Sequence, residues 1–133
     1  MSRLRNTTTF ILLASFLSFS NQTLYSQNSS AKNKILSING YLAGKIPISI
    51  IKKATHLDIK PPYTLISSTV YFSSHIGGDT NMTFIKGSVF DKNFLQLWSR
   101  VSVNTIITFD NIKVLQDGKV LDLIGASFQV IED

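Results

Sequence analysis

Apolar and polar residues alternate along most of the C-terminal segment, residues 103–131. Two apolar-rich runs in this segment flank Asp117 and Gly118, a dipeptide suited to the two-residue turn of a β-hairpin. The runs are rich in β-branched and aromatic residues, which favour strands, and the alternation is interrupted around Asn111 and Gly125. The pattern predicts three features: a strand over 101–110, a hairpin at 117–118 and a final strand that ends at Ile131.

A second alternating run, residues 63–74, predicts the longest strand of the chain. Successive side chains of a strand point to opposite faces, so Val70 and Tyr71 would lie on different sides. Fully extended, this run would be about 40 Å long at roughly 3.3 Å per residue, which is too long for a straight strand in a small domain. We therefore expect a bulge or bend near Ser67 and Ser68.

Two short helices are predicted from capping residues followed by amphipathic runs. Ser49 can cap a helix over 50–54, although the isoleucines of this run would suit a strand equally well. Asp91 can cap a second helix over 92–100, where Arg100 would lie near the negative end of the helix dipole. Two short strands complete the prediction: 35–38 and 82–85.

These elements define the expected fold class. About seven strands and two short helices predict one mostly-β domain over residues 35–133. We expect a β-sandwich with an immunoglobulin-like layout, with the two helices at its edges. The order of the strands in the sheets does not follow from the pattern.

The N-terminal segment has the pattern of a secretory signal peptide. Arg3 and Arg5 precede a ten-residue apolar run, 10–19, which is too short to span a bilayer core about 30 Å thick. We predict cleavage near Gln27, with Ser20 as the alternative, and hence a protein located in the periplasm or secreted. An uncleaved membrane anchor is the other interpretation of this segment.

Composition limits the classes of protein further. The chain has 133 residues and no cysteine, so it has neither disulfides nor thiolate metal ligands, nor an acylated cysteine. Residues 1–27 contain two arginines and no acidic residue, so their removal would lower the formal net charge from +5 to +3. No basic stripe is interleaved with aromatic residues, which argues against a nucleic-acid partner. Residues 28–34 are polar and predict a flexible leader, and no further segment predicts a membrane span.

Several motifs occur in an order that resembles the C-terminal domain of the gliding-motility protein GldM. The resemblance covers residues 35–131. The motifs are GKIPISIIKKA (44–54), TLISSTVYFSS (64–74) followed by Gly77-Gly78, FDKNFLQLWSRV (90–101), FDNIKV (109–114), DGK (117–119) and LIGASF (123–128).

The resemblance implies a stand-alone domain of this family, whose members belong to a periplasmic motor and type IX secretion complex. The full-length family member also has a transmembrane motor helix and further periplasmic domains, for which this sequence shows no counterpart. The resemblance therefore implies the fold and a role in protein–protein contact in gliding or secretion, and not the motor function.

Candidate catalytic residues are few, and no cofactor is predicted. His56 lies near Asp58 and His75 lies four residues before Asp79, but a metal site needs three or four converging ligands. A second candidate is a carboxylate pair that Asp110 could form with Asp122 if their strands pair. There is no GxSxG elbow, and the glycine pair is not a phosphate loop because no GK[ST] follows. We therefore expect a protein that is not an enzyme and binds no metal.

The leading functional hypothesis is an exported module that binds another protein of the envelope. The long strand is lined by Ser and Thr and could provide an open sheet edge for strand addition. Its candidate contact residues are Tyr71, Thr69, Ser67 and Tyr63.

An alternative hypothesis is a periplasmic β-sandwich that binds a glycan or another small ligand. It requires a flat, exposed row of aromatic residues, for which Tyr41, Tyr71 and Trp98 are candidates. We expect Trp98 to pack instead into the core with Phe94 or Leu95, because all three would lie on the second predicted helix.

Overall fold

A computed structural model describes residues 33–74 and 79–133. The predicted signal peptide, its cleavage site and His75 lie outside the described residues. None of the helices in the described part is long and apolar enough to cross a membrane. In chain order the elements are β1 (Leu36–Ser37), β2 (Gly44–Pro47), α2 (Ile48–Lys53), β3 (Asp58–Ile59), β4 (Thr64–Ser74), β5 (Thr80–Lys86), α3 (Lys92–Trp98), β6 (Thr105–Gln116), β7 (Lys119–Leu123) and β8 (Ala126–Ile131).

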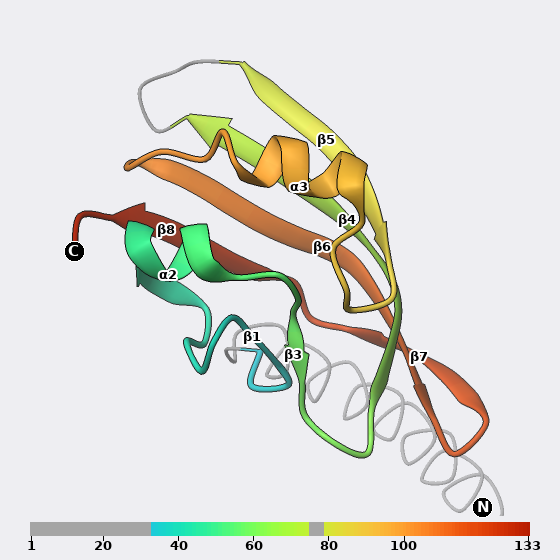
Figure 1. Ribbon diagram of the computed structural model, residues 1–133. Coiled ribbons are helices and arrows are strands. Elements are labelled where there is room, and N and C mark those ends of the chain that lie inside the picture. The colour runs from blue at the N-terminus through green and yellow to red at the C-terminus, as the bar shows by residue number, and fades with distance from the viewer. Residues whose placement is uncertain (1–32, 75–78) are drawn as a thin grey trace, which may run out of the picture. The chain divides into compact units, whose positions relative to one another are not determined.

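The domain is mostly β and has two layers, which confirms the predicted class. One layer is a six-stranded sheet in the order β2-β8-β6-β4-β5, with β7 paired to the second half of β6. Only β2 and β8 run parallel, and every other pair in this sheet is antiparallel. The second layer consists of the antiparallel β1–β3 pair together with α2 and α3, and both helices lie on the same face of the large sheet (Figure 1). The predicted placement of the two helices at the edges is wrong, because both cover a face of the large sheet.

Strand β6 shows how the alternating pattern forms the core. Ile107 and Phe109 are fully buried, and so are Ile112 and Val114, although the two pairs differ in parity. Asn111 has a φ of 48° at a point where β6 has one more residue than its partner β4, so Phe109 before it and Ile112 after it both point into the core. The interruption predicted at Asn111 is thus confirmed, but the strand begins at Thr105 and not at residue 101.

Strand β4 contains a matching irregularity, which confirms the predicted bulge. Its register against β6 shifts on both sides of Ser67. As a result Leu65 and Val70, which differ in parity, are both buried. The Ser68 hydroxyl donates to the backbone oxygen of Asp110 at 2.9 Å and thereby links the two irregular segments.

The hairpin predicted at 117–118 is also confirmed. Asp117 and Gly118 have φ values of 51° and 75° and connect β6 to β7. A turn with two positive φ values suits the right-handed twist of paired strands. Near this turn Val114 lies opposite Leu121, and Leu115 lies opposite Val120, in the β6–β7 pair.

Helix α3 begins where the sequence predicts. The Asp91 carboxylate accepts a hydrogen bond from the Phe94 amide at 2.7 Å and caps the helix. Phe94 and Trp98 lie one turn apart, are both 2% exposed, and have ring centroids 5.6 Å apart. Trp98 therefore packs with Phe94, as one of the two predicted arrangements requires, whereas Leu95 faces outward and is 37% exposed.

The prediction that Ser49 caps the first helix is wrong. Helix α2 begins at Ile48, directly after Pro47, whose φ of −65° and ψ of 145° end β2. Ser49 therefore lies inside the first turn, and its amide donates to Asp133 Oδ1 at 3.0 Å. The Asp133 carboxylate, distant in the sequence, thus accepts from an amide of the first helical turn, which is the role expected of the Ser49 hydroxyl.

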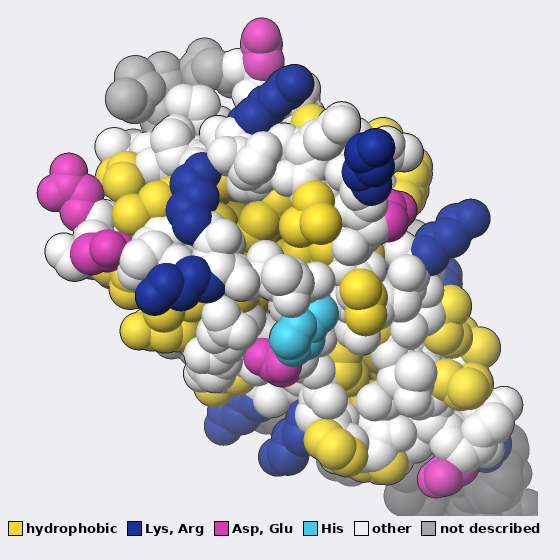
Figure 2. All heavy atoms as spheres, in the orientation of Figure 1, with side chains coloured by type: hydrophobic (Ala, Val, Ile, Leu, Met, Phe, Trp, Pro, Cys, Tyr) yellow, Lys and Arg dark blue, Asp and Glu magenta, His cyan; other side chains and the backbone are white. Residues whose placement is uncertain are grey.

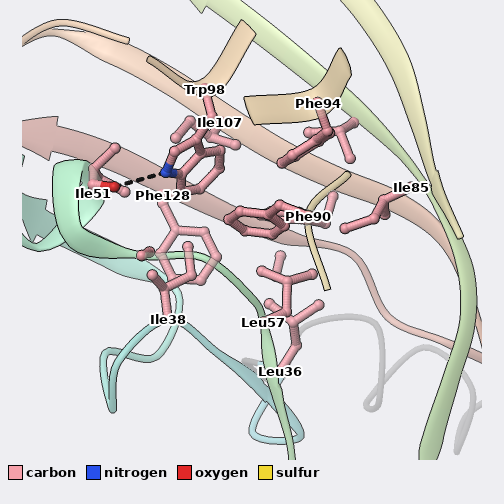
Figure 3. Packing of buried hydrophobic residues seen from close by; sticks show 14 of the residues in the cluster. Leu36, Ile38, Ile51, Leu57, Ile85, Phe90, Phe94, Trp98, Ile107 and Phe128 are labelled. Atoms are coloured by element: carbon pink, nitrogen blue, oxygen red, sulfur yellow. Dashed lines mark hydrogen bonds between the residues drawn. The ribbon is translucent and has the colours of Figure 1, made fainter. Parts of the chain in front are cut away.

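The two helices are joined by side-chain contacts to backbone carbonyls. Trp98 Nε1 donates to the Ile51 oxygen at 2.7 Å inside the core (Figure 3). Lys52 Nζ donates to the oxygens of Ser99 at 2.6 Å and Val101 at 2.7 Å, beyond the end of α3. The Ile51 oxygen also accepts from the Ala54 amide, so the indole adds a second bond there. Together these bonds hold α3 and the segment after it against α2.

The described part of the chain begins with a buried residue. Asn33 is 5% exposed, and its carboxamide donates to the Ile124 oxygen and accepts from the amides of Ile35 and Leu36. The packed domain thus includes Asn33, which lies two positions before the predicted domain boundary.

Candidate functional site

The long strand β4 lies inside the sheet, between β5 and β6. The prediction that it provides an open edge is therefore wrong. Its run of Ser and Thr indicated a solvated strand, but Ser68 is 1% exposed and Thr69 is 8% exposed. Hydroxyl residues can be buried here because hydrogen bonds to backbone oxygens satisfy the Ser68 hydroxyl.

Three of the four predicted contact residues share one face of β4. Ser67, Thr69 and Tyr71 lie on the face opposite to the buried Val70, which is also the face opposite to the helices. Tyr63 precedes the strand, is partly buried and packs against the core, so the structure does not bring it to this surface. Of the three, Tyr71 is partly exposed and Thr69 has little surface to offer a partner.

Strand β5 lies at one end of the sheet instead; β2 lies at the other end, and in the described part of the chain β7 pairs only with β6. Within the described residues β5 pairs only with β4, so its other side has no neighbouring strand. It contains no proline, and its one charged residue is Lys86 at its end. Natural sheets commonly protect edges with charges, proline or bulges, and β5 has little of this protection.

The outward face of β5 is apolar. Met82 is 55% exposed and Phe84 is 63% exposed, and the two side chains point to the same side of the strand. Met82 lies opposite Tyr71 in the register, and Phe84 lies opposite Thr69. We call Met82, Phe84 and Tyr71 the β5 patch. It combines apolar surface with unpaired backbone groups at one edge.

Sequence reasoning missed Met82 and Phe84. The return strand was predicted, but nothing in its own pattern shows whether a further strand pairs with it. One available signal was that the next element along the chain is a helix, which cannot extend the sheet. The carbonyls and amides on the far side of this strand then depend on water or on a partner.

The predicted acidic pair does not form. Strands β6 and β7 do pair, but their register places Asp122 opposite Lys113, with Lys113 Nζ 2.9 Å from Asp122 Oδ1. Asp110 lies opposite Thr69 and accepts from the neighbouring Asn111 amide at 2.8 Å. Each carboxylate is therefore engaged locally, and the two are not brought to one cleft.

The described histidine makes a hydrogen bond to a carboxylate at the surface. His56 Nε2 lies 3.1 Å from Asp58 Oδ1, and both side chains are more than 40% exposed. Its other ring nitrogen lies 3.3 Å from the hydroxyl of Thr55. No group of three potential metal ligands occurs within residues 33–74 and 79–133.

The aromatic row that a glycan-binding site would require is not formed. Trp98 is 2% exposed and belongs to an aromatic cluster in the core (Figure 3). Tyr41 is 38% exposed, and Tyr71 is partly buried on the sheet face. Without Trp98, the two tyrosines do not make the flat row that stacking on sugars needs.

The helix-covered face does not present a concentrated charge. Figure 2 shows lysine and arginine side chains scattered over this face, with apolar patches and acidic groups between them. The β5 patch is thus the best-defined candidate site that the described residues offer.

Comparison with known proteins found no matching family model, no matching curated protein and no matching solved structure. The resemblance to the C-terminal domain of GldM stays a prediction.

Proposed function

We propose that this chain is an exported, non-enzymatic protein-interaction module of the cell envelope. In this proposal the edge of β5 binds an extended segment of another envelope protein. The observation that carries the proposal is the edge itself, which has no partner strand in the described part of the chain and carries two exposed apolar side chains.

The geometry of β5 suits strand addition. A strand paired to an exposed edge gains main-chain hydrogen bonds, and side chains at alternate positions supply the specificity. Met82 and Phe84 are two residues apart, so a segment with apolar residues at alternate positions would lay them against both. Complete burial of an exposed phenylalanine side chain is worth about 1.5–3 kcal/mol, or roughly ten- to a hundred-fold in affinity.

The N-terminal segment supports the envelope location. A basic start, a short apolar run and a polar stretch are typical of a cleaved secretory signal. The resemblance to a periplasmic domain of a gliding and secretion complex agrees with this location. It also suggests that the partner is a component of such a complex.

Crosslinking in intact cells tests the proposal. Cells expressing the wild type or the Phe84→Gln variant are crosslinked, and the products are identified by mass spectrometry. We expect one or a few envelope proteins crosslinked to the wild type and at least a tenfold lower yield with the variant. The substitution should leave stability nearly unchanged, because the side chain is 63% exposed.

The matched control is Val120→Gln, which replaces a 60% exposed apolar residue on the distant hairpin. It should crosslink as the wild type does. Equal yields from Phe84→Gln and the wild type, or recovery of the wild type only as an uncrosslinked monomer, would refute the proposal.

A further inference from the structure

A separate hollow of about 270 Å³ opens where β4 ends and where β5 and β6 begin, next to the end of α3. Its apolar wall is formed by Phe72, Leu97 and Val101. Ionisable and amide groups also line it, namely Arg100, Asp79 and Asn81. The hollow lies on the helix-covered side of the sheet, because it is lined by Phe72, a core residue of β4.

Arg100 lies two residues past the end of α3 and forms no salt bridge within the described residues. An arginine at this place commonly binds the free carbonyls at the end of a helix. In this chain Lys52 Nζ already donates to the oxygens of Ser99 and Val101. Within residues 33–74 and 79–133 the contacts between a basic and an acidic side chain are His56–Asp58 and Lys113–Asp122, and neither includes Arg100. Its guanidinium is thus available to a carboxylate, which it can bind through two parallel hydrogen bonds.

Asp79 restricts the choice of ligand. It lies in the lining of the same hollow and takes part in neither of those two contacts. One cation and one anion give the lining no net charge, so a phosphate or a dicarboxylate would meet repulsion from Asp79. A ligand that carries a carboxylate and an ammonium group together can use both side chains.

We propose that this hollow binds a free α-amino acid with an apolar side chain. Arg100 binds its carboxylate, Asp79 attracts its ammonium group, and the side chain contacts the wall formed by Phe72, Leu97 and Val101. A hollow of about 270 Å³ is below the range typical of drug-sized ligands, so it suits a ligand of this size. The hollow shares Asn81 with strand β5 but contains none of the three residues of the β5 patch.

A titration followed by 1H–15N NMR of the purified protein tests the proposal, with leucine as the probe. Leucine should shift the amide signals of Ser102, Asn104 and Thr105, which line the hollow. It should not shift the indole N–H of Trp98, which is bonded to Ile51 inside the core. Leucine amide, which lacks the carboxylate, and inorganic phosphate should produce no shift at the same concentration.

Three variants assign the roles. Arg100→Met should weaken leucine binding at least tenfold, as expected for loss of a charge-assisted contact. Asp79→Asn should remove the preference for leucine over N-acetyl-leucine, which lacks the positive charge. Lys92→Met removes a cation from the first turn of α3 and should bind leucine as the wild type does.

The spectrum of each variant reports directly whether the fold is retained. The proposal is overturned if leucine produces no shift at the hollow, or if leucine amide shifts the same amides equally. Equal binding by Arg100→Met and Lys92→Met would also overturn it. Equal binding of leucine and N-acetyl-leucine by the wild type would remove Asp79 from the site and contradict the proposed ligand class.

Discussion

Single residues with unusual backbone angles control the path of the chain. Four described non-glycine residues have positive φ, and all are Asn or Asp: Asn39, Asn104, Asn111 and Asp117. These side chains are short and polar, and they tolerate the left-handed region better than other L-residues do. Asn111 is the most consequential of them, because the inward face of β6 changes parity there.

A pair of substitutions at Asn111 isolates this backbone effect. Asn111→Gly should leave the free energy of unfolding within a few tenths of a kcal/mol of the wild type, because glycine adopts a φ of 48° without strain. Asn111→Ala should lower it by about 1 kcal/mol. Urea denaturation followed by circular dichroism measures both. Because both variants lose the same carboxamide, equal destabilisation would contradict a backbone cause.

Some residue positions could be predicted because their signals are local. The turn at Asp117 and Gly118 and the cap at Asp91 depend on neighbours within three residues, and both were found where the sequence placed them. The acceptor for the Ser49 amide is Asp133, which is 84 positions away. No local pattern identifies a partner at that distance, so the cap was assigned to the serine hydroxyl.

At the scale of the element, α3 is held by its aromatic face. Phe94 and Trp98 stack on each other and contact Phe72 and Phe90 at centroid distances between 4.6 and 6.3 Å. A helix of seven residues is not stable alone in water, so this packing and the bond to Ile51 keep it folded.

Trp98→Phe tests how much the indole contributes. The variant loses the hydrogen bond to the Ile51 oxygen and part of the packed volume, so the free energy of unfolding should fall by about 2 kcal/mol. Urea denaturation should be followed by circular dichroism, because the chain has one tryptophan and the variant has no comparable fluorescence.

Leu95→Ala is the control for this prediction. Leu95 lies on the outward side of the same helix and is 37% exposed, so its truncation should cost less than about 1 kcal/mol. An equal loss from Leu95→Ala and Trp98→Phe would show that the aromatic face does not specifically hold α3.

The existence of most elements follows from periodicity, but their neighbours do not. The alternation in β4 and β6 predicted both strands, and the length of the β4 run predicted the irregular segment near Ser67. The same alternation is compatible with an edge or an interior position in the sheet. It shows which side chains are buried, and not whether a neighbouring strand bonds to the backbone on each side. The alternation of β4 therefore could not show that β4 is interior and that β5 and β2 are the two end strands of the sheet.

At the scale of the whole domain, the two sides of the large sheet differ. The helices and the β1–β3 pair lie on one face, and no described helix covers the other (Figure 1). Long-range pairings such as β2 with β8 and β4 with β6 create this arrangement. The β5 patch exists only as a consequence of that strand order, which is why the sequence alone could not locate it.

A partner is proposed to add a strand to β5. Amide hydrogen exchange tests this most directly, measured on the free protein and on its complex with the partner that crosslinking identifies. In a sheet, alternate amides of an edge strand point away from the sheet and exchange with water until another strand pairs with them. We predict that the alternate amides of residues 80–86 that do not bond to β4 become protected in the complex, while those of β4 and β6, already paired on both sides, change little. Protection confined to α2 and α3, with β5 unchanged, would contradict the claim.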